Sequence, residues 1–272
     1  MDPYLRVAED ELIIPGLRDQ YVFFHISDTH LAVWDENSTE EEVRKAEAWE
    51  ARWLRDKEIC AREFGEPFGD AQRISTAEGF EKLIEFAEAE KPDALILTGD
   101  SLDRMHPAGE RFLASKLAKC QLPFLAVPGN HEVGSLPGVW QPGVQILDYK
   151  DFRVVGVDDR LGTVSSEDLD QLERLGAEDI PMIVCCHIPI STDSNRKIMH
   201  RLDPYFFIEK ETADENGIRF VEFLTGCTAV KLLLCGHIHG YSDTEVFPGK
   251  HQITASQGMI GFIHRLVVKG EN

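Results

Sequence analysis

Five short groups of metal-type ligand residues each follow an apolar run, and this arrangement restricts the fold more than any other feature. The apolar runs are predicted strands that span Tyr21–Ser27, Ala94–Thr98, Phe124–Val127, Met182–Cys186 and Leu232–Cys235. The groups that follow are Asp28-Thr29-His30, Gly99-Asp100-Ser101-Leu102-Asp103, Gly129-Asn130-His131-Glu132, His187 and Gly236-His237-Ile238-His239. Because open α/β folds build their sites where strand ends meet at one sheet edge, we expect these groups to converge.

The residue types in these groups favour one or two divalent ions. Carboxylate and amide oxygens occur in the first three groups and imidazoles in the others, which suits Mn, Fe or Zn better than Ca or a thiolate zinc site. Seven ligands are too many for one ion with an open position, but they fit two ions that share a bridge: Asp28, His30, Asp100, Asn130, His187, His237 and His239. Two ions ~3.5–4 Å apart can clamp both oxygens of an in-line displacement.

Each group taken alone has an ordinary structural explanation. An Asp-x-His pair is common by chance, Gly and Asn favour turns, and a single histidine after a strand is usually a core residue. The combination is different, because five of the ten histidines fall in the pattern and each follows an apolar strand. The ordered set therefore indicates a metal site.

Strand and helix patterns alternate along most of the 272 residues, which predicts an α/β fold. A capping box begins at Ser75 and opens a helix to about Ala89. Other predicted elements are helices at Ala108–Lys119 and Ser165–Leu175, a strand at Phe152–Val157, and three final strands at Thr244–Phe247, Gln252–Ala255 and Phe262–Val268, which suggest an antiparallel finish. No interdomain linker is apparent, so we expect a single domain over residues 1–272 with insertions near 36–64 and 191–217.

The two insertions each follow a ligand group, so we expect both near the site entrance. Glu36–Phe64 is a charged helix with one face formed by Val43, Ala46, Trp49 and Trp53. That face indicates packing, with a lid or a dimer contact as the alternative. Ser191–Gly217 is polar and is expected to be irregular.

Composition excludes several classes of partner. The formal charge of −20 would repel duplex nucleic acid and anionic membranes over most of the surface. No stretch approaches the ~18 apolar residues of a membrane span, and the start of the chain has no secretion signal. The six cysteines are scattered without a CxxC pair, which indicates a reduced, cytoplasmic setting.

The ordered set of motifs resembles the calcineurin-like metallophosphoesterase superfamily. Its pattern is D-x-H, G-D-x-x-D, G-N-H-[DE], H and G-H-x-H, which here runs from Asp28 to His239. The resemblance implies a four-layer α/β/β/α sandwich around two mixed β-sheets. It also implies a dinuclear enzyme that hydrolyses a small-molecule phosphate mono- or diester by means of a metal-bridged hydroxide, without a covalent intermediate.

The resemblance further assigns a role to each residue. One ion would be held by Asp28, His30 and His239. The other would be held by Asn130, His187 and His237, with Asp100 as the bridge. His131 would act as general acid or stabilise charge at the leaving-group oxygen, and Asp103 would orient its imidazole.

Arg104 extends the second motif to G-D-x-x-D-R. In the protein phosphatase branch an arginine here contacts phosphate, and an extra cation would favour monoesters; the alternative is a solvated surface arginine. His106 and Glu132 are further candidates for substrate contact. The chain lacks the additional arginine motifs of that branch between His131 and His187. It resembles instead the small bacterial branch that includes cyclic-nucleotide and glycerophosphodiester phosphodiesterases.

Two other functions compete with a small-molecule phosphoesterase. A nuclease of the same superfamily would need a basic surface, and the acidic balance argues against it. A non-catalytic binding scaffold would be expected to have lost ligands, whereas all seven are present.

Overall fold

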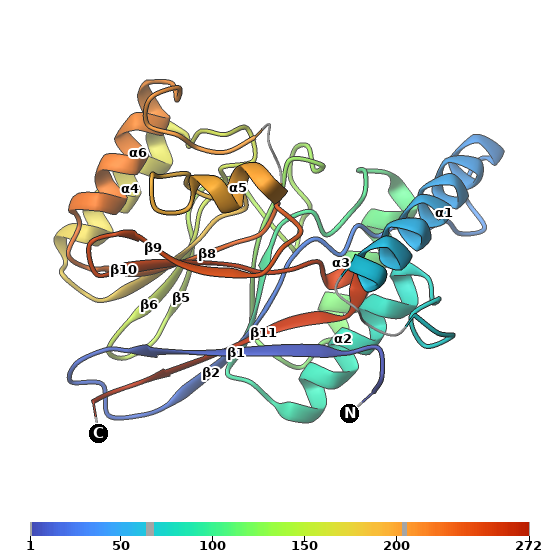
Figure 1. Cartoon of the computed structure of the whole chain (residues 1–272), viewed down its shortest axis with the longest axis horizontal. Coiled ribbons are helices and arrows are strands. Elements are labelled where there is room, and N and C mark those ends of the chain that lie inside the picture. The colour runs from blue at the N-terminus through green and yellow to red at the C-terminus, as the bar shows by residue number, and fades with distance from the viewer. Residues whose placement is uncertain (1, 64–67, 203–205, 272) are drawn as a thin grey trace.

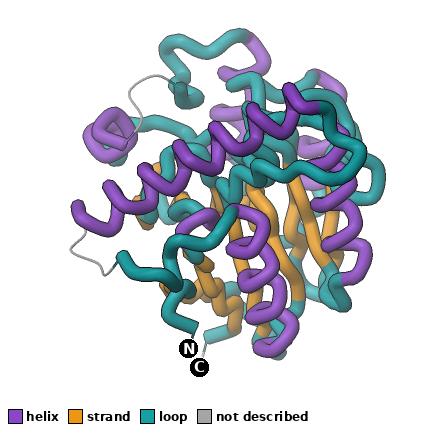
Figure 2. The backbone as a smooth tube through the Cα atoms, turned by 90° about the vertical axis from the view of Figure 1, so that its right-hand side faces the viewer, coloured by secondary structure: helices purple, strands orange, loops and turns teal. Residues whose placement is uncertain are grey.

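The computed structural model of the chain describes residues 2–63, 68–202 and 206–271. Two mixed β-sheets form its centre and helices cover them (Figures 1 and 2). The strands are β1 (Arg6–Ile13), β2 (Tyr21–Ile26), β3 (Ala94–Thr98), β4 (Phe124–Val127), β5 (Gln145–Asp148), β6 (Arg153–Gly156), β7 (Met182–Cys185), β8 (Val230–Cys235), β9 (Ser242–Phe247), β10 (Lys250–Thr254) and β11 (Phe262–Lys269). The helices are α1 (Glu40–Glu63), α2 (Thr76–Glu90), α3 (Pro107–Lys119), α4 (Ser166–Ala177), α5 (Arg196–Leu202), α6 (Glu215–Gly226) and the short 3₁₀ helix η1 (Gly258–Ile260).

The strand order places the ligand-bearing strands side by side. The first sheet has the order β1-β11-β2-β3-β4, and β2, β3 and β4 run parallel. The second sheet has the order β5-β6-β7-β8-β10-β9, and β6, β7, β8 and β10 run parallel. Parallel neighbours end at the same sheet edge, so the loops after these strands meet there.

Three apolar clusters confirm the predicted four-layer α/β/β/α sandwich. Side chains such as Phe24 and Leu95 face helices α2 and α3, whereas Phe23 and Ile96, one residue away along the same strands, face the second sheet. In the second sheet Val184 faces α4 and α6, whereas Ile183 faces the first sheet. The alternation along each strand therefore fills all three interlayer spaces.

Most predicted elements are confirmed. The strands β3 and β4 have the predicted bounds, and Ser75 and Glu78 form the predicted capping box before α2. The antiparallel finish is only partly right, because β9 pairs antiparallel with β10, but β10 runs parallel to β8 and β11 crosses into the first sheet.

The two segments predicted as insertions differ in one respect from the prediction. The first contains helix α1, and its predicted end at Phe64 lies outside the described residues. The second was expected to be irregular, which is only partly right, because it holds α5 and the first turn of α6; residues 203–205 lie outside the description. None of the helices in the described ranges is both long and apolar enough to cross a membrane.

Candidate active site

The loops after β2, β3 and β8 hold predicted ligand residues in a left-handed backbone conformation. Among the described residues, seven non-glycine residues have a positive φ, and five of these are predicted ligands: Asp28 (55°), His30 (43°), Asp100 (48°), His237 (70°) and His239 (53°). This conformation costs a non-glycine residue roughly 1–2 kcal/mol and is concentrated at functional sites in proteins. The backbone of these loops is therefore strained, and the strain coincides with the residues that are predicted to bind metal.

One group of potential ligand atoms comes from Asp28, His30 and His239, whose atoms all lie within 4.8 Å of one another. The Nε2 atoms of the two imidazoles are 2.9 Å apart, and Nε2 of His239 lies 3.5 Å from Oδ1 of Asp28. Oδ1 of Asp28 is buried and has no hydrogen-bond partner in the described part of the chain, whereas Oδ2 accepts the backbone N–H of His237 at 3.0 Å. A buried carboxylate oxygen without a donor beside two imidazoles fits a cation.

A second group comes from Asp100, His187 and His237. Oδ1 of Asn130 lies 3.0 Å from Nε2 of His187 and 3.0 Å from Nδ1 of His237, so the amide joins this group. Oδ2 of Asp100 lies 3.3 Å from Nε2 of His187 and 4.0 Å from Nε2 of His30, which places it between the two groups. All seven predicted ligands therefore meet in one place.

Electrostatics within the site also suit a metal. Burial raises the pKa of Asp28, but the neighbouring His239 imidazole outweighs this effect and lowers that pKa to about 2. Burial opposes protonation of His187, but the Asp100 carboxylate beside it raises the pKa of this imidazole to about 10. This negative charge favours a cation, and a bound ion would displace the His187 proton. Burial lowers the pKa of His30 to about 3, which keeps that imidazole neutral, as a metal ligand must be.

Two motif glycines allow the loops to approach one another closely. A Cβ atom on Gly129 would lie 2.2 Å from Oδ1 of Asp100. Gly99 has a φ of +89°, and a Cβ atom there would lie 2.6 Å from Nδ1 of His187. The glycines before Asp100 and Asn130 are therefore required by packing within the site.

Two buried carboxylates hold the ligand loops from behind. Glu132 accepts the backbone N–H groups of Leu102 at 2.9 Å and Gly129 at 2.6 Å, so it joins two loops. Burial and the charge of Asp100 raise its pKa to about 8. Glu132 was predicted as a candidate for substrate contact. This prediction is wrong, because Glu132 is buried and both its carboxylate oxygens accept backbone N–H groups.

The second of these carboxylates is Asp159, which the sequence analysis missed. It accepts the backbone N–H of His187 at 2.7 Å and that of Ile188 at 3.0 Å. It is fully buried, and burial raises its pKa to about 7. No motif includes it; its only signal in the sequence is its position just after the strand β6.

His131 lies at the edge of the ligand groups. Its Nδ1 is 2.7 Å from the main-chain oxygen of Asp103, and its Nε2 is 3.9 Å from Oδ2 of Asp100. The contact with Asp103 uses its main-chain carbonyl rather than its carboxylate. That carboxylate accepts a hydrogen bond from Nε1 of Trp53 at 3.1 Å instead, and burial raises its pKa.

A pocket of about 410 Å³ opens over the ligands, and α1 forms one of its walls. The Trp53 ring lies 4.4 Å from the His30 ring, and Trp49 also lines the pocket. The guanidinium groups of Arg104 and Arg52 lie over the Trp49 ring at 5.2 and 5.0 Å. Trp49, Trp53 and Arg52 were not predicted as site residues, although their spacing of three and four residues along a helix signals one shared face.

The second segment predicted as an insertion, 191–217, also reaches the predicted ligands. The ring of Phe206 lies 5.5 Å from the His237 ring. Each of the two segments predicted as insertions thus places an aromatic ring against a predicted ligand, as expected for segments near the site entrance. His106, another candidate for substrate contact, instead caps α3 by accepting the N–H of Gly109 and lines a neighbouring cavity.

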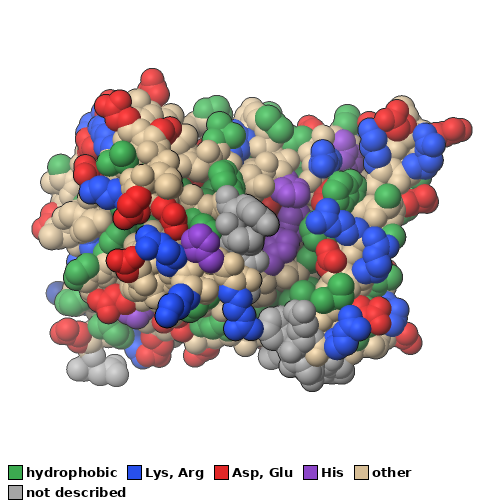
Figure 3. All heavy atoms as spheres, turned by 45° about the horizontal axis from the view of Figure 1, so that its top comes forward, with side chains coloured by type: hydrophobic (Ala, Val, Ile, Leu, Met, Phe, Trp, Pro, Cys, Tyr) green, Lys and Arg blue, Asp and Glu red, His purple; other side chains and the backbone are tan. Residues whose placement is uncertain are grey.

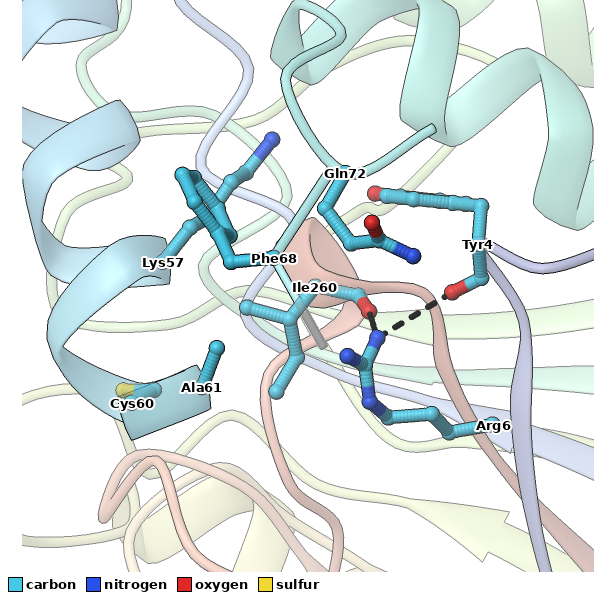
Figure 4. Close-up of a pocket in the computed structure, with 8 residues that line it drawn as sticks. All are labelled: Tyr4, Arg6, Lys57, Cys60, Ala61, Phe68, Gln72 and Ile260. Carbon is cyan, nitrogen blue, oxygen red and sulfur yellow. Dashed lines mark hydrogen bonds between the residues drawn. The ribbon is translucent and has the colours of Figure 1, made fainter. Parts of the chain in front are cut away.

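A small cavity beneath the end of α1 is not a competing site (Figure 4). It holds only about 10 Å³, close to the space of a single water molecule. Arg6 is fixed at its edge by the carbonyl oxygens of Tyr4 at 3.2 Å and Ile260 at 2.5 Å. The cavity is a packing gap between α1 and its neighbours.

The fold and the site together define a metal-dependent hydrolase, and comparison with known proteins gives its family. The family model of the calcineurin-like phosphoesterases matches residues 21–241, so the chain belongs to this family and is a metal-dependent phosphoric ester hydrolase. No curated protein sequence matches the chain. Among solved structures, a dimetal phosphatase from Danio rerio is similar in fold, with a TM-score of 0.54, 14% identity and 88% of each chain covered.

Proposed function

We propose that the chain hydrolyses a phosphate mono- or diester of a small molecule with two metal ions in this site. The position of Asp100 carries the proposal, because its Oδ2 lies between His187 and His30 and can serve both ions. The first ion would be held by Asp28, His30 and His239 and the second by Asn130, His187 and His237. When bound, such ions supply charge neutralisation and lower the pKa of a coordinated water, and Mn, Fe or Zn suits the donors.

His131 is proposed to protonate the leaving-group oxygen. A carbonyl oxygen can only accept, so the contact with Asp103 fixes a proton on Nδ1 and leaves Nε2 to face the pocket. As a general acid, His131 would donate its proton from this Nε2. Asp103 thus positions His131 through its backbone.

Arg104 is proposed to bind phosphate oxygens. Its side chain is exposed at the pocket, and the Trp49 ring beneath it limits its directions. The pocket volume suits a small molecule rather than a polymer. A nuclease of the same family is the second candidate. It ranks below a small-molecule enzyme because the charge of −20 disfavours binding of nucleic acid.

A hydrolysis panel on reconstituted protein tests the function. Protein loaded with Mn, Zn or Fe is assayed against mono- and bis-nitrophenyl phosphate, phenyl phosphate, nucleotides, glycerophosphodiesters and single-stranded oligonucleotides. We expect metal-dependent turnover of small esters that chelation abolishes. Faster cleavage of oligonucleotides would favour the nuclease, and no turnover with any metal would favour a binding scaffold.

His131→Ala tests the mechanism separately. We expect a rate loss of ~10²–10⁴ on phenyl phosphate and a smaller loss on nitrophenyl phosphate, because a good leaving group needs little protonation. Metal content should stay at the wild-type value. His251→Ala is the control, since His251 is half exposed and pairs with Asp243 away from the pocket. Loss of metal from His131→Ala would show that His131 is a ligand.

A further inference from the structure

A broad groove adjoins the candidate active site and continues from it. Its volume is about 1170 Å³, and it shares Ile238 and His239 with the pocket over the ligands. Its other walls include α5, the end of α1 and the region around η1. Because the two cavities share residues, one ligand can occupy the metal site and extend into the groove.

Helix α5 directs two cations into this groove. Lys197 and Arg201 lie four residues apart on the helix and are exposed, and both line the groove. Neither makes a hydrogen bond or an ion pair with any residue that the structure describes. Arg196 on the same helix differs, because it pairs with Asp193 and Glu209. The helix therefore uses one arginine for structure and leaves two cations available.

The charge of the groove is opposite to that of the whole chain. The chain has 48 acidic and 28 basic residues, yet the described residues lining the groove include Arg6, Lys197 and Arg201 and no Asp or Glu. Figure 3 shows Lys and Arg side chains on both sides of the central histidines. On such an acidic surface a local cationic groove favours an anion.

We propose that this groove binds a second oxyanion of the substrate, through Lys197 and Arg201, while the scissile phosphate occupies the metal site. The inference rests on the proposed function, because it assumes a phosphoester over the ligands. Its consequence is a substrate class: phosphoesters that carry a further phosphate or carboxylate away from the scissile bond. Arg6 forms part of the wall rather than a free contact, because its guanidinium is bonded to backbone carbonyls.

Inhibition by anions of graded length tests the proposal. Hydrolysis of nitrophenyl phosphate by the Mn-loaded protein is inhibited with alkane α,ω-bisphosphonates of three to six carbons. The comparison compounds are ω-carboxyalkyl phosphonates and simple alkyl phosphonates of equal length. For at least one length we expect the second anion to lower Ki about tenfold, which corresponds to roughly 1.4 kcal/mol. Comparison of Ki for the ω-carboxyalkyl phosphonates with Ki for the bisphosphonates shows whether the groove prefers a carboxylate or a phosphonate.

The variant Lys197→Gln/Arg201→Gln should lose most of this advantage while its Ki for alkyl phosphonates stays near the wild-type value. Lys150→Gln/Arg174→Gln removes the same charge from exposed residues that line neither cavity and should keep the advantage. The inference is overturned if wild-type protein shows no advantage at any length, or if the first variant retains it. Melting temperatures confirm that both variants fold.

Failure of the proposed function would be distinguishable from failure of this inference. If no ester is hydrolysed, calorimetric titration of the Mn-loaded protein with the same phosphonates still gives the affinity ratio in wild type and variants. If wild-type protein binds the bisphosphonate no more tightly than the alkyl phosphonate of equal length, the groove is not an anion site. A large ratio that is lost only in Lys197→Gln/Arg201→Gln would support it without catalysis.

Discussion

Asp159→Asn should damage the proposed metal site although Asp159 is not among its predicted ligands. The carboxylate accepts two backbone N–H groups, from His187 at 2.7 Å and Ile188 at 3.0 Å. An asparagine has one oxygen, so one N–H group would face an NH₂ donor and lose its partner. One lost hydrogen bond to a charged group, together with an unsatisfied buried donor, amounts to about 2–4 kcal/mol of unfolding free energy.

The effect on metal should accompany the effect on stability, because the same N–H groups set the position of the His187 ring. Loss of a group that orients a ligand typically lowers metal affinity about 10–100-fold. Urea unfolding of the metal-free protein, followed by tryptophan fluorescence, gives the stability. Competition with a chromogenic chelator gives the metal affinity. Both are measured at pH 8, where the Asp159 pKa of about 7 leaves the carboxylate ionised.

Asp158→Asn is a matched control, because it makes the same chemical change at the neighbouring residue. Asp158 is partly exposed and pairs with Arg160 at 2.8 Å, so its loss should cost only about 0–1 kcal/mol and leave metal affinity intact. Equal losses in the two variants, or wild-type metal affinity in Asp159→Asn, would refute the positioning role of Asp159.

Three further outcomes are expected. Arg104→Ala should lower kcat/KM for monoesters more than for diesters, and Arg104→Lys should recover part of the loss, because lysine restores the charge but not the fork; equal losses for both esters would remove the monoester preference. Burial lowers the pKa of Lys57 from 10.5 to about 8, so the unfolded state binds more protons between these values. Lys57 should therefore contribute about 3 kcal/mol of stability that appears as pH rises through that window. Because other groups such as His187 titrate there too, the contribution is measured in urea titrations as the pH-dependent difference between wild type and Lys57→Met. Removal of metal by chelation should lower the melting temperature, since ligand at 100 Kd contributes about 2.7 kcal/mol, and an unchanged temperature would argue against bound metal.

The sequence predicted which residues meet at the site better than it predicted how they are held. Residues directly after apolar strands lie at a sheet edge, so the local sequence pattern was sufficient to predict the positions of Asp28 and His187. The hydrogen bond from Trp53 to Asp103 joins residues 50 positions apart, and no local pattern specifies it. Asp159 belongs to no motif, and its role depends on the pairing of β6 with β7.

The missed elements have physical explanations as well. The strand β1 reads Arg6–Ile13 with four charged residues, which is typical of an edge strand protected from further pairing. Helix α5 has only seven residues, too few for a clear amphipathic period. The first and last strands pair with each other in parallel, and such a contact between chain ends cannot be read from either segment alone.

The two carboxylates predicted as metal ligands, Asp28 and Asp100, each hold backbone with one oxygen and face imidazoles with the other. Oδ2 of Asp28 holds the backbone of His237, while Oδ1 faces two imidazoles. Oδ1 of Asp100 holds the backbone of His131, while Oδ2 faces His187. Each carboxylate thus stabilises the left-handed or tightly turned loop of another site residue. The cost of these conformations, roughly 1–2 kcal/mol each, is offset within the site itself, so the ligand loops form a connected unit rather than independent contacts.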